Sequence, residues 1–118
     1  MYELLFWQYA DDVYLNHHIV YEKLCEQEHV DGLENLPIDV ILNRITNVFS
    51  TWEKLDDNSW KNSDGLGAFQ IKSTEQSIKI DCYGTNGKTM DKLVAMMEEF
   101  KCPLYDPQIP ARYDDYFE

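Results

Sequence analysis

The residues best suited to bind a metal are a cysteine and the histidines near the start of the chain. Cys25 and His29 stand four positions apart, a spacing that puts two side chains on one face of a helix. Two ligands do not complete a zinc site, and the sequence has no HExxH or CxxC motif to supply the others. His17 and His18 are neighbours and point in different directions on a helix. We therefore expect exposed histidines and predict no metal and no cofactor.

A second place for chemistry is Cys82, at the end of a predicted strand and just before a glycine-containing turn. Its alternation with Ile78 and Ile80 puts the thiol on the apolar face of that strand, which is typical of a buried cysteine. The turn ends in Gly-Lys-Thr, but a phosphate-binding loop needs a glycine five positions before Gly87, where Cys82 stands. One alternative stays open, namely a small enzyme or ligand-binding domain with a pocket near Cys82–Lys88.

Acidic residues that stand among aromatic residues form the most suggestive pattern in the sequence. Carboxylates follow one another between Lys23 and Arg44 with no intervening lysine or arginine, and further groups occur near residue 56 and in the tail at 112–118. Aromatic rings supply buried area at protein interfaces, and charges supply steering and orientation. Our candidate partner contacts are Glu22, Glu26, Glu28, Asp56, Asp57 and Trp60.

Composition narrows the classes of partner. The 118 residues include 22 acidic and 10 basic side chains, for a formal net charge of −12. Such a surface repels nucleic-acid backbones and anionic membranes, so we expect neither as a partner. A basic protein is the natural electrostatic complement. The three separated cysteines do not suggest a disulfide framework, and the opening residues lack the basic region of a signal peptide, so we predict a cytoplasmic location.

The elements that position these residues are indicated by hydrophobic spacing. A continuous apolar run opens the chain and is typical of a strand covered on both faces, hence central in a sheet. Alternating apolar residues predict a hairpin with one face in the core and the other in water, and Thr89 is the expected N-cap of the last helix. The expected strands are 2–9, 68–73 and 77–83, with a short edge strand at 103–105, and the expected helices are 18–27, 37–49 and 89–101.

These elements predict a single α+β domain over residues 1–118, with a short acidic and aromatic C-terminal tail. We expect a single-layer, mainly antiparallel sheet packed against two or three helices. The order of strand, helices, hairpin, helix and short strand is also that of a ferredoxin-like, split β-α-β arrangement, which places the first strand centrally.

Five segments carry a resemblance to a known group of proteins. They are YELLFW at 2–7, LPI at 36–38, GAFQI at 67–71, IDCYG at 80–84 and CPLYDPQ at 102–108. With these segments the chain resembles small acidic bacterial immunity-type proteins, which accompany polymorphic or contact-dependent growth-inhibition toxins. The resemblance implies a cytoplasmic protein that binds its cognate toxin domain and blocks either the active site or the substrate-binding surface. It carries over no contact residues, because such families vary most at their binding surfaces.

The leading hypothesis from the sequence is therefore an immunity protein and not an enzyme. It would neutralise a cognate toxin, in the simplest case a basic nuclease domain, by occupying its active site with complementary charge.

Overall fold

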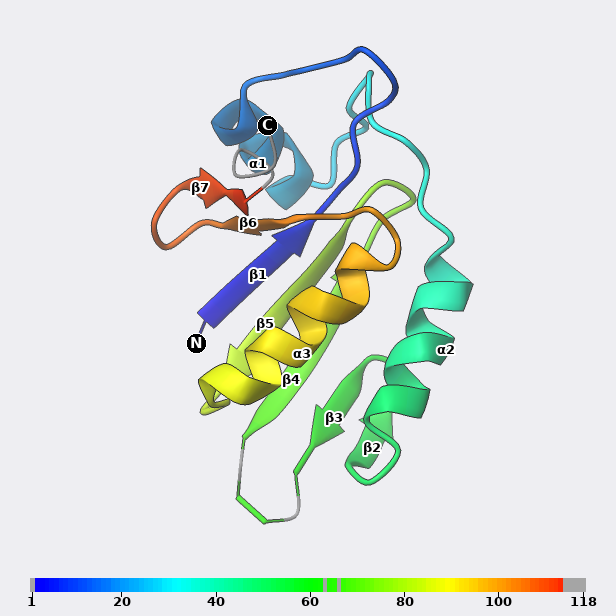
Figure 1. Cartoon of the computed structure of the whole chain (residues 1–118), viewed down its shortest axis with the longest axis vertical. Helices are drawn as coiled ribbons and strands as arrows, with labels where there is room; N and C mark the ends of the chain where they lie inside the picture. Colours follow the sequence, from blue (N-terminus) through cyan, green and yellow to red (C-terminus); the bar gives the residue numbers. More distant parts are fainter. Residues whose placement is uncertain (1, 63, 66, 114–118) are drawn as a thin grey trace.

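The computed structural model describes residues 2–62, 64–65 and 67–113. In that part of the chain the fold is a seven-stranded antiparallel sheet with three helices, which confirms the predicted α+β class (Figure 1). The strands are β1 (Tyr2–Phe6), β2 (Glu53–Asp56), β3 (Ser59–Lys61), β4 (Ala68–Ser73), β5 (Ile78–Tyr83), β6 (Leu104–Asp106) and β7 (Ala111–Arg112). The helices are α1 (His17–Cys25), α2 (Ile38–Val48) and α3 (Gly87–Glu98).

The apolar opening segment forms the central strand, as predicted. In the strand order β2-β3-β4-β5-β1-β6-β7, β1 is hydrogen-bonded to β5 on one side and to β6 on the other. Leu4 and Phe6 are buried on one face of the sheet, and Leu5 and Trp7 are buried on the other. Both faces of β1 are therefore covered, and this is why its sequence is apolar without alternation.

The four central strands have the predicted split β-α-β arrangement. β5 pairs antiparallel with both β4 and β1, so β4 and β1 run in the same direction with β5 between them. A connection that contains α1 and α2 joins β1 to β4, and α3 joins β5 to β6. β2, β3 and β7 extend this four-stranded unit at its two edges.

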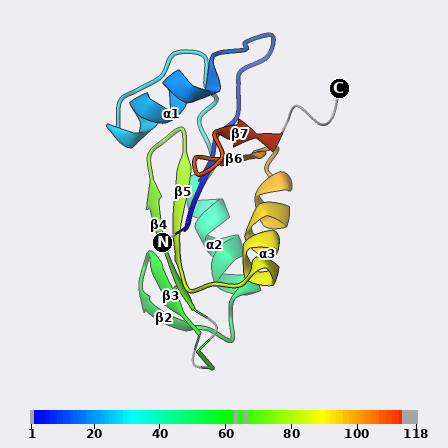
Figure 2. The same ribbon diagram turned by 90° about the vertical axis from the view of Figure 1, so that its left-hand side faces the viewer.

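One face of the sheet is covered by α2 and α3, which lie next to each other (Figure 2). The apolar residues of α2 recur at helical spacing, so Ile41 and Ile45 point into the core. In α3 the same spacing buries Leu93 and Met97. These side chains share one cluster with the inward-facing residues of β1, β4 and β5, which forms the main core.

The opposite face is covered at one end by α1 (Figure 2). Val20 and Leu24, one helical turn apart, are the two residues of α1 that are buried against Leu5. Ile19 is 52% exposed and Cys25 is exposed, so neither belongs to the buried stripe of this helix. A helix of nine residues can place one stripe on the sheet, and here the stripe runs through Val20 and Leu24.

Two local assignments also differ from the prediction. α3 begins at Gly87 because Asn86, not Thr89, is the N-cap, with its Oδ1 atom accepting a 2.9 Å hydrogen bond from the Thr89 backbone N–H. The segment after Cys102 does form a short strand, but β6 is not an edge strand. β7 pairs with it, Tyr105 facing Arg112, and takes the edge position.

The turn between β5 and α3 is held by close contact between two glycines. Gly67, which precedes β4, has a φ angle of +103°. A Cβ atom at this position would lie 2.7 Å from the backbone carbon of Gly84 and from the backbone nitrogen of Thr85. Only glycine fits here, since both the backbone conformation and the space exclude a side chain.

We expect Gly67→Ala to lower the free energy of unfolding by about 2 kcal/mol or more, because the new methyl group would have to displace backbone atoms. Gly87→Ala is the matched control, since a Cβ atom there meets nothing within 4 Å. The control should leave stability unchanged or raise it by up to about 1 kcal/mol. Urea unfolding followed by circular dichroism measures both, and equal effects of the two substitutions would contradict the close-contact explanation.

Candidate protein-binding surface

Three of the predicted contact residues lie together on the outer side of α1. Glu22 is in the last turn of the helix, Glu26 is its C-cap residue and Glu28 follows in the next loop, and all three are exposed. They line one shallow depression with the exposed Ile19 and the half-buried Tyr21, and Lys23 and Cys25 complete its lining. The three glutamates with Ile19 and Tyr21 are called the α1 surface below, and Lys23 is the one cation beside them. This surface combines carboxylates with an apolar and an aromatic side chain, the composition expected of an interface for a basic protein.

The negative charge of the chain is concentrated around this surface. Residues 9–36 contain seven carboxylates and one lysine, a net charge of −6 out of −12 for the whole chain. Residues 37–112 contain eleven carboxylates and nine lysines or arginines, a net charge of only −2. The segment that contains α1 therefore carries half of the net charge, which favours the capture of a cationic partner there.

The carboxylates of α1 lie at positions that are electrostatically unfavourable for the helix. A helix C-terminus carries partial negative charge and is stabilised by cations, yet Glu22 and Glu26 occupy the last turn and the C-cap of α1. They are also four residues apart, where like charges repel. A 3.4 Å contact between His18 Nε2 and Glu22 offsets part of this cost when the histidine is protonated. Residues that reduce local stability in this way are typical of a surface used for binding.

The second predicted group, Asp56 and Asp57, lies far from the first. Both views show the β2–β3 hairpin and α1 at opposite ends of the long axis (Figures 1 and 2). Asp56 has a local structural role, since its Oδ1 atom accepts a 2.8 Å hydrogen bond from the Asn58 backbone N–H in the turn. Lys54 and Lys61 on the same hairpin reduce its net charge. The two acidic groups therefore form two separate surfaces.

Trp60, the aromatic residue predicted to accompany this second group, is buried in the main core. Its side chain is 1% exposed and stacks on Phe69, with ring centroids 5.2 Å apart. The Nζ atom of Lys54 lies 5.6 Å from the centroid of the Trp60 ring and covers its outer side. An indole in this position stabilises the hairpin and is not accessible to a partner, so we remove it from the contact surface.

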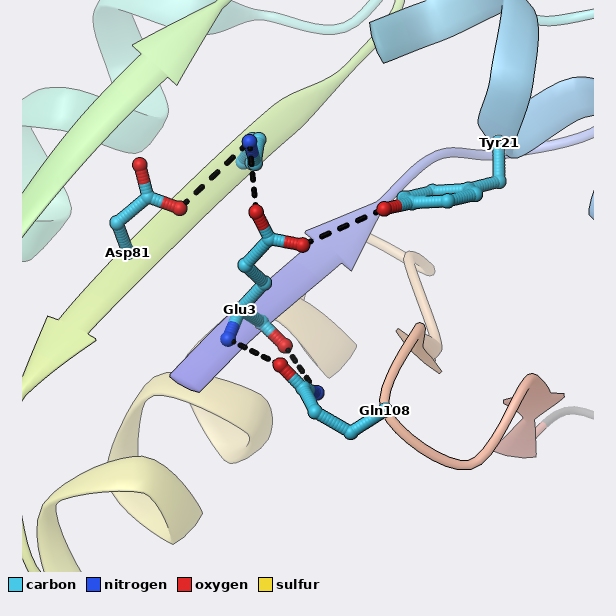
Figure 3. Close-up of polar contacts among 5 residues, drawn as sticks. Glu3, Tyr21, Asp81 and Gln108 are labelled. Carbon is cyan, nitrogen blue, oxygen red and sulfur yellow. Dashed lines mark hydrogen bonds and ion pairs between the residues drawn. The ribbon is translucent and has the colours of Figure 1, made fainter. Parts of the chain in front are cut away.

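A polar network lies between the α1 surface and the sheet (Figure 3). Glu3 on β1 accepts a 3.3 Å hydrogen bond from the Tyr21 hydroxyl and forms a 3.0 Å ion pair with Lys79 on β5. The Nζ atom of Lys79 is also 3.7 Å from a carboxylate oxygen of Asp81. The side-chain amide of Gln108 bonds both backbone groups of Glu3, at 2.7 and 3.0 Å, and so continues the ladder where β6 ends. This network connects α1 to the middle of the sheet.

The electrostatics of the network depend on Lys79. Burial alone would lower the pKa of Lys79, but its hydrogen bond to Glu3 and the charge of Asp81 outweigh this and raise the pKa. Asp81 is 3% exposed, and its Oδ1 atom has no hydrogen-bond partner among the described residues, so the ammonium group balances its charge. Burial and a hydrogen bond to Cys25 raise the pKa of Tyr21, which keeps its hydroxyl protonated. The cluster is therefore a charged support for α1.

The alternative site near Cys82–Lys88 does not hold an accessible thiol. Cys82 is 1% exposed, and burial raises its pKa although a hydrogen bond to Thr85 opposes this effect. The neighbouring groove is lined by polar and charged residues that include Asn86, Lys88 and Lys92, and Cys82 is not among them. As predicted, Cys82 is a buried apolar side chain. What remains near this turn is a groove without a reactive cysteine.

The described part of the chain contains neither a metal-binding cluster nor a membrane-spanning helix. No group of three or more His, Cys, Asp or Glu side chains in that part of the chain is arranged to hold a metal ion. Cys25 and His29 have no third ligand within such a group. None of the described helices has the length and apolar content needed to cross a membrane.

Comparison of the chain with protein-family models, with curated proteins and with solved structures found no match.

Sequence reasoning missed part of the site. The contacts predicted from the sequence did not include Ile19 and Tyr21, which line the same depression as the carboxylates, although Tyr21 also stacks on Tyr105 below the helix. The signal that could have identified Tyr21 is its position directly before Glu22, within the acidic run. Lys79 and Asp81 were expected on a wet strand face, and for Asp81 this was wrong, because the network buries it.

The unfavourable placement of Glu26 leads to a prediction about stability. Glu26→Gln removes a negative charge from the C-cap of α1 and should raise the free energy of unfolding by about 0.3–1 kcal/mol at low ionic strength. Asp57→Asn makes the same charge change on the exposed hairpin turn, away from any helix end, and should change stability less. Urea unfolding of both variants tests this, and a loss of stability in Glu26→Gln would contradict it.

The three cysteines should differ in reactivity. Cys25 is exposed, whereas Cys82 and Cys102 are buried, and burial raises the pKa of Cys102 to about 11. A chromogenic disulfide reagent at neutral pH should therefore modify Cys25 in the folded protein, and all three thiols after denaturation in urea. Peptide mapping by mass spectrometry identifies the modified residue. Rapid labelling of Cys82 in the folded state would revive the enzyme alternative.

Proposed function

We propose that this chain is a non-enzymatic, cytoplasmic immunity protein that binds a basic toxin domain and blocks its active site. The observation that supports this proposal is the α1 surface, an acidic and partly apolar patch at the end that carries half of the net charge. The sequence resemblance to immunity-type proteins supplies the class of partner.

Charge complementarity supports a nuclease as the simplest partner. A nuclease cleft collects lysines and arginines in order to bind phosphates, and those groups attract a patch of carboxylates in the same way. Glu22, Glu26 and Glu28 would occupy the positions of phosphate groups, while Ile19 and Tyr21 would contribute buried contact area. Asp56 and Asp57 would lie outside the contact.

The alternative function is a small ligand-binding domain that uses the groove beside Lys88. Two lysines and two asparagine side chains line this groove and would suit a small anionic ligand, although the carboxylate of Asp91 lines it too. Because Cys82 is buried, the alternative has lost its candidate nucleophile. We therefore rank it below the protein-binding proposal.

Charge reversal on the α1 surface tests the proposal. The double variant Glu22→Lys/Glu26→Lys should lower the affinity for the partner by about 10- to 100-fold at low salt, because attraction becomes repulsion. Asp57→Lys/Asp64→Lys makes the same change of charge at exposed positions of the opposite end and should bind almost as the unmodified chain does. Equal loss in both variants would point to net charge alone and contradict a localised interface.

The partner for this measurement is obtained by affinity capture from native lysate at low and moderate salt, with identification by mass spectrometry. Support requires that expression of the captured protein arrests bacterial growth and that co-expression of this chain restores it. A captured protein without toxicity, or one whose toxicity this chain does not relieve, would contradict the proposed function even if the α1 surface binds it.

A further inference from the structure

A second surface lies on the other side of the sheet, between α3 and the edge formed by β1 and β6. It is a groove of about 550 Å³ whose apolar lining comes from Leu4 of β1, Met90 and Val94 of α3 and Leu104 of β6. The polar atoms at its wall already have partners, since Tyr2 donates its hydroxyl hydrogen to Asp106. The remaining surface of the groove is therefore mainly apolar.

The exposed charges around this groove are negative. Asp91 and Glu98 of α3 line it and are exposed. The lysines of the same helix, Lys88 and Lys92, line the groove on the other side of α3 instead. Asp91 lies between the two grooves and lines both, whereas Glu98 lines only the apolar groove, so the exposed charges at the apolar groove are both negative.

The distance between the two carboxylates sets the distance between the basic side chains that could pair with them. Asp91 and Glu98 are seven residues apart, which is about 10 Å along a helix axis. In a polyproline II segment, which has three residues per turn and rises about 3.1 Å per residue, side chains three positions apart lie on the same side, about 9 Å apart. We propose that this groove binds a basic segment of a partner protein, with apolar side chains on Met90 and Val94 and a Lys or Arg at each end paired with Asp91 and Glu98.

The segment of this chain that follows Tyr113 is a poorer occupant. Its sequence includes Asp114, Asp115 and Glu118, which would bring further carboxylates to a rim that is already negative. Repulsion between like charges therefore favours a basic partner over the acidic tail. The inference does not depend on the α1 surface, which lies against the opposite face of the sheet.

The test uses two short peptides and the ¹⁵N-labelled protein. The first is an acetylated and amidated Lys-Leu-Leu-Lys peptide, which has the proposed spacing. The second is Asp-Asp-Tyr-Phe-Glu, the sequence that ends this chain. The basic peptide should shift amide signals of the groove residues Met90, Val94 and Leu104, and the acidic peptide should not. Shifts confined to α1, shifts dispersed over the surface, or equal binding of the acidic peptide would overturn the proposal.

Matched variants on α3 assign the binding site. Val94→Arg places a bulky cation inside the groove and should weaken binding of the basic peptide about tenfold or more. Ala95→Arg places the same side chain at the next position, which is exposed and outside the groove, and should leave binding unchanged. Equal weakening by the two variants would overturn the proposal.

A variant at the rim of the groove keeps the test valid if Val94→Arg does not fold. Glu98→Lys changes an exposed residue and should also weaken binding of the basic peptide, with the unfolding transition unchanged. The variant Glu22→Lys/Glu26→Lys should bind the peptide in the groove as before, which separates this inference from the proposed function. Retention of full binding by Glu98→Lys would overturn the assignment of the rim.

Discussion

The rest of the structure depends on β1, a strand that must be covered on both faces at once. Leu4 and Phe6 require the cover that α2 and α3 provide, and Leu5 and Trp7 require the cover of α1. Burial of each such side chain contributes about 1.5–3 kcal/mol, so loss of either cover would remove an amount comparable to the total stability of a small domain. The split strand order follows, because it places β1 between β5 and β6 in the interior of the sheet.

The one charged residue of β1 links this constraint to the proposed binding surface. Glu3 faces the side of the sheet that α1 only partly covers. There it accepts a hydrogen bond from the Tyr21 hydroxyl and forms an ion pair with Lys79. Lys79 is thereby held between carboxylates on the side of α1 that faces the sheet, while Glu22, Glu26 and Glu28 stay exposed to solvent. Glu3 and Asp81 share the single positive charge of Lys79, so the network keeps a net charge of −1 and adds to the negative field of the exposed glutamates.

The predictions from sequence were accurate where a pattern was long and its period was clear. The apolar run of β1, the alternation in β4 and β5 and the helical spacing of α2 and α3 all produced the expected elements. The candidate site was predicted less well. Glu22, Glu26 and Glu28 do lie together, but Trp60 is in the core, because alternation along a three-residue strand is too short to indicate which face is buried.

The sequence by itself determined the α+β class, the central position of the first strand and the burial of Cys82, because each follows from local periodicity and from the need to bury apolar surface. Only the tertiary structure decided which charges act together. Residues 22–28 and 56–57 are both rich in carboxylates, yet one group lies on α1 and the other in a hairpin turn at the opposite end of the molecule (Figure 1). The physical reason is that electrostatic interaction depends on distance in space and on exposure, and a linear pattern specifies neither.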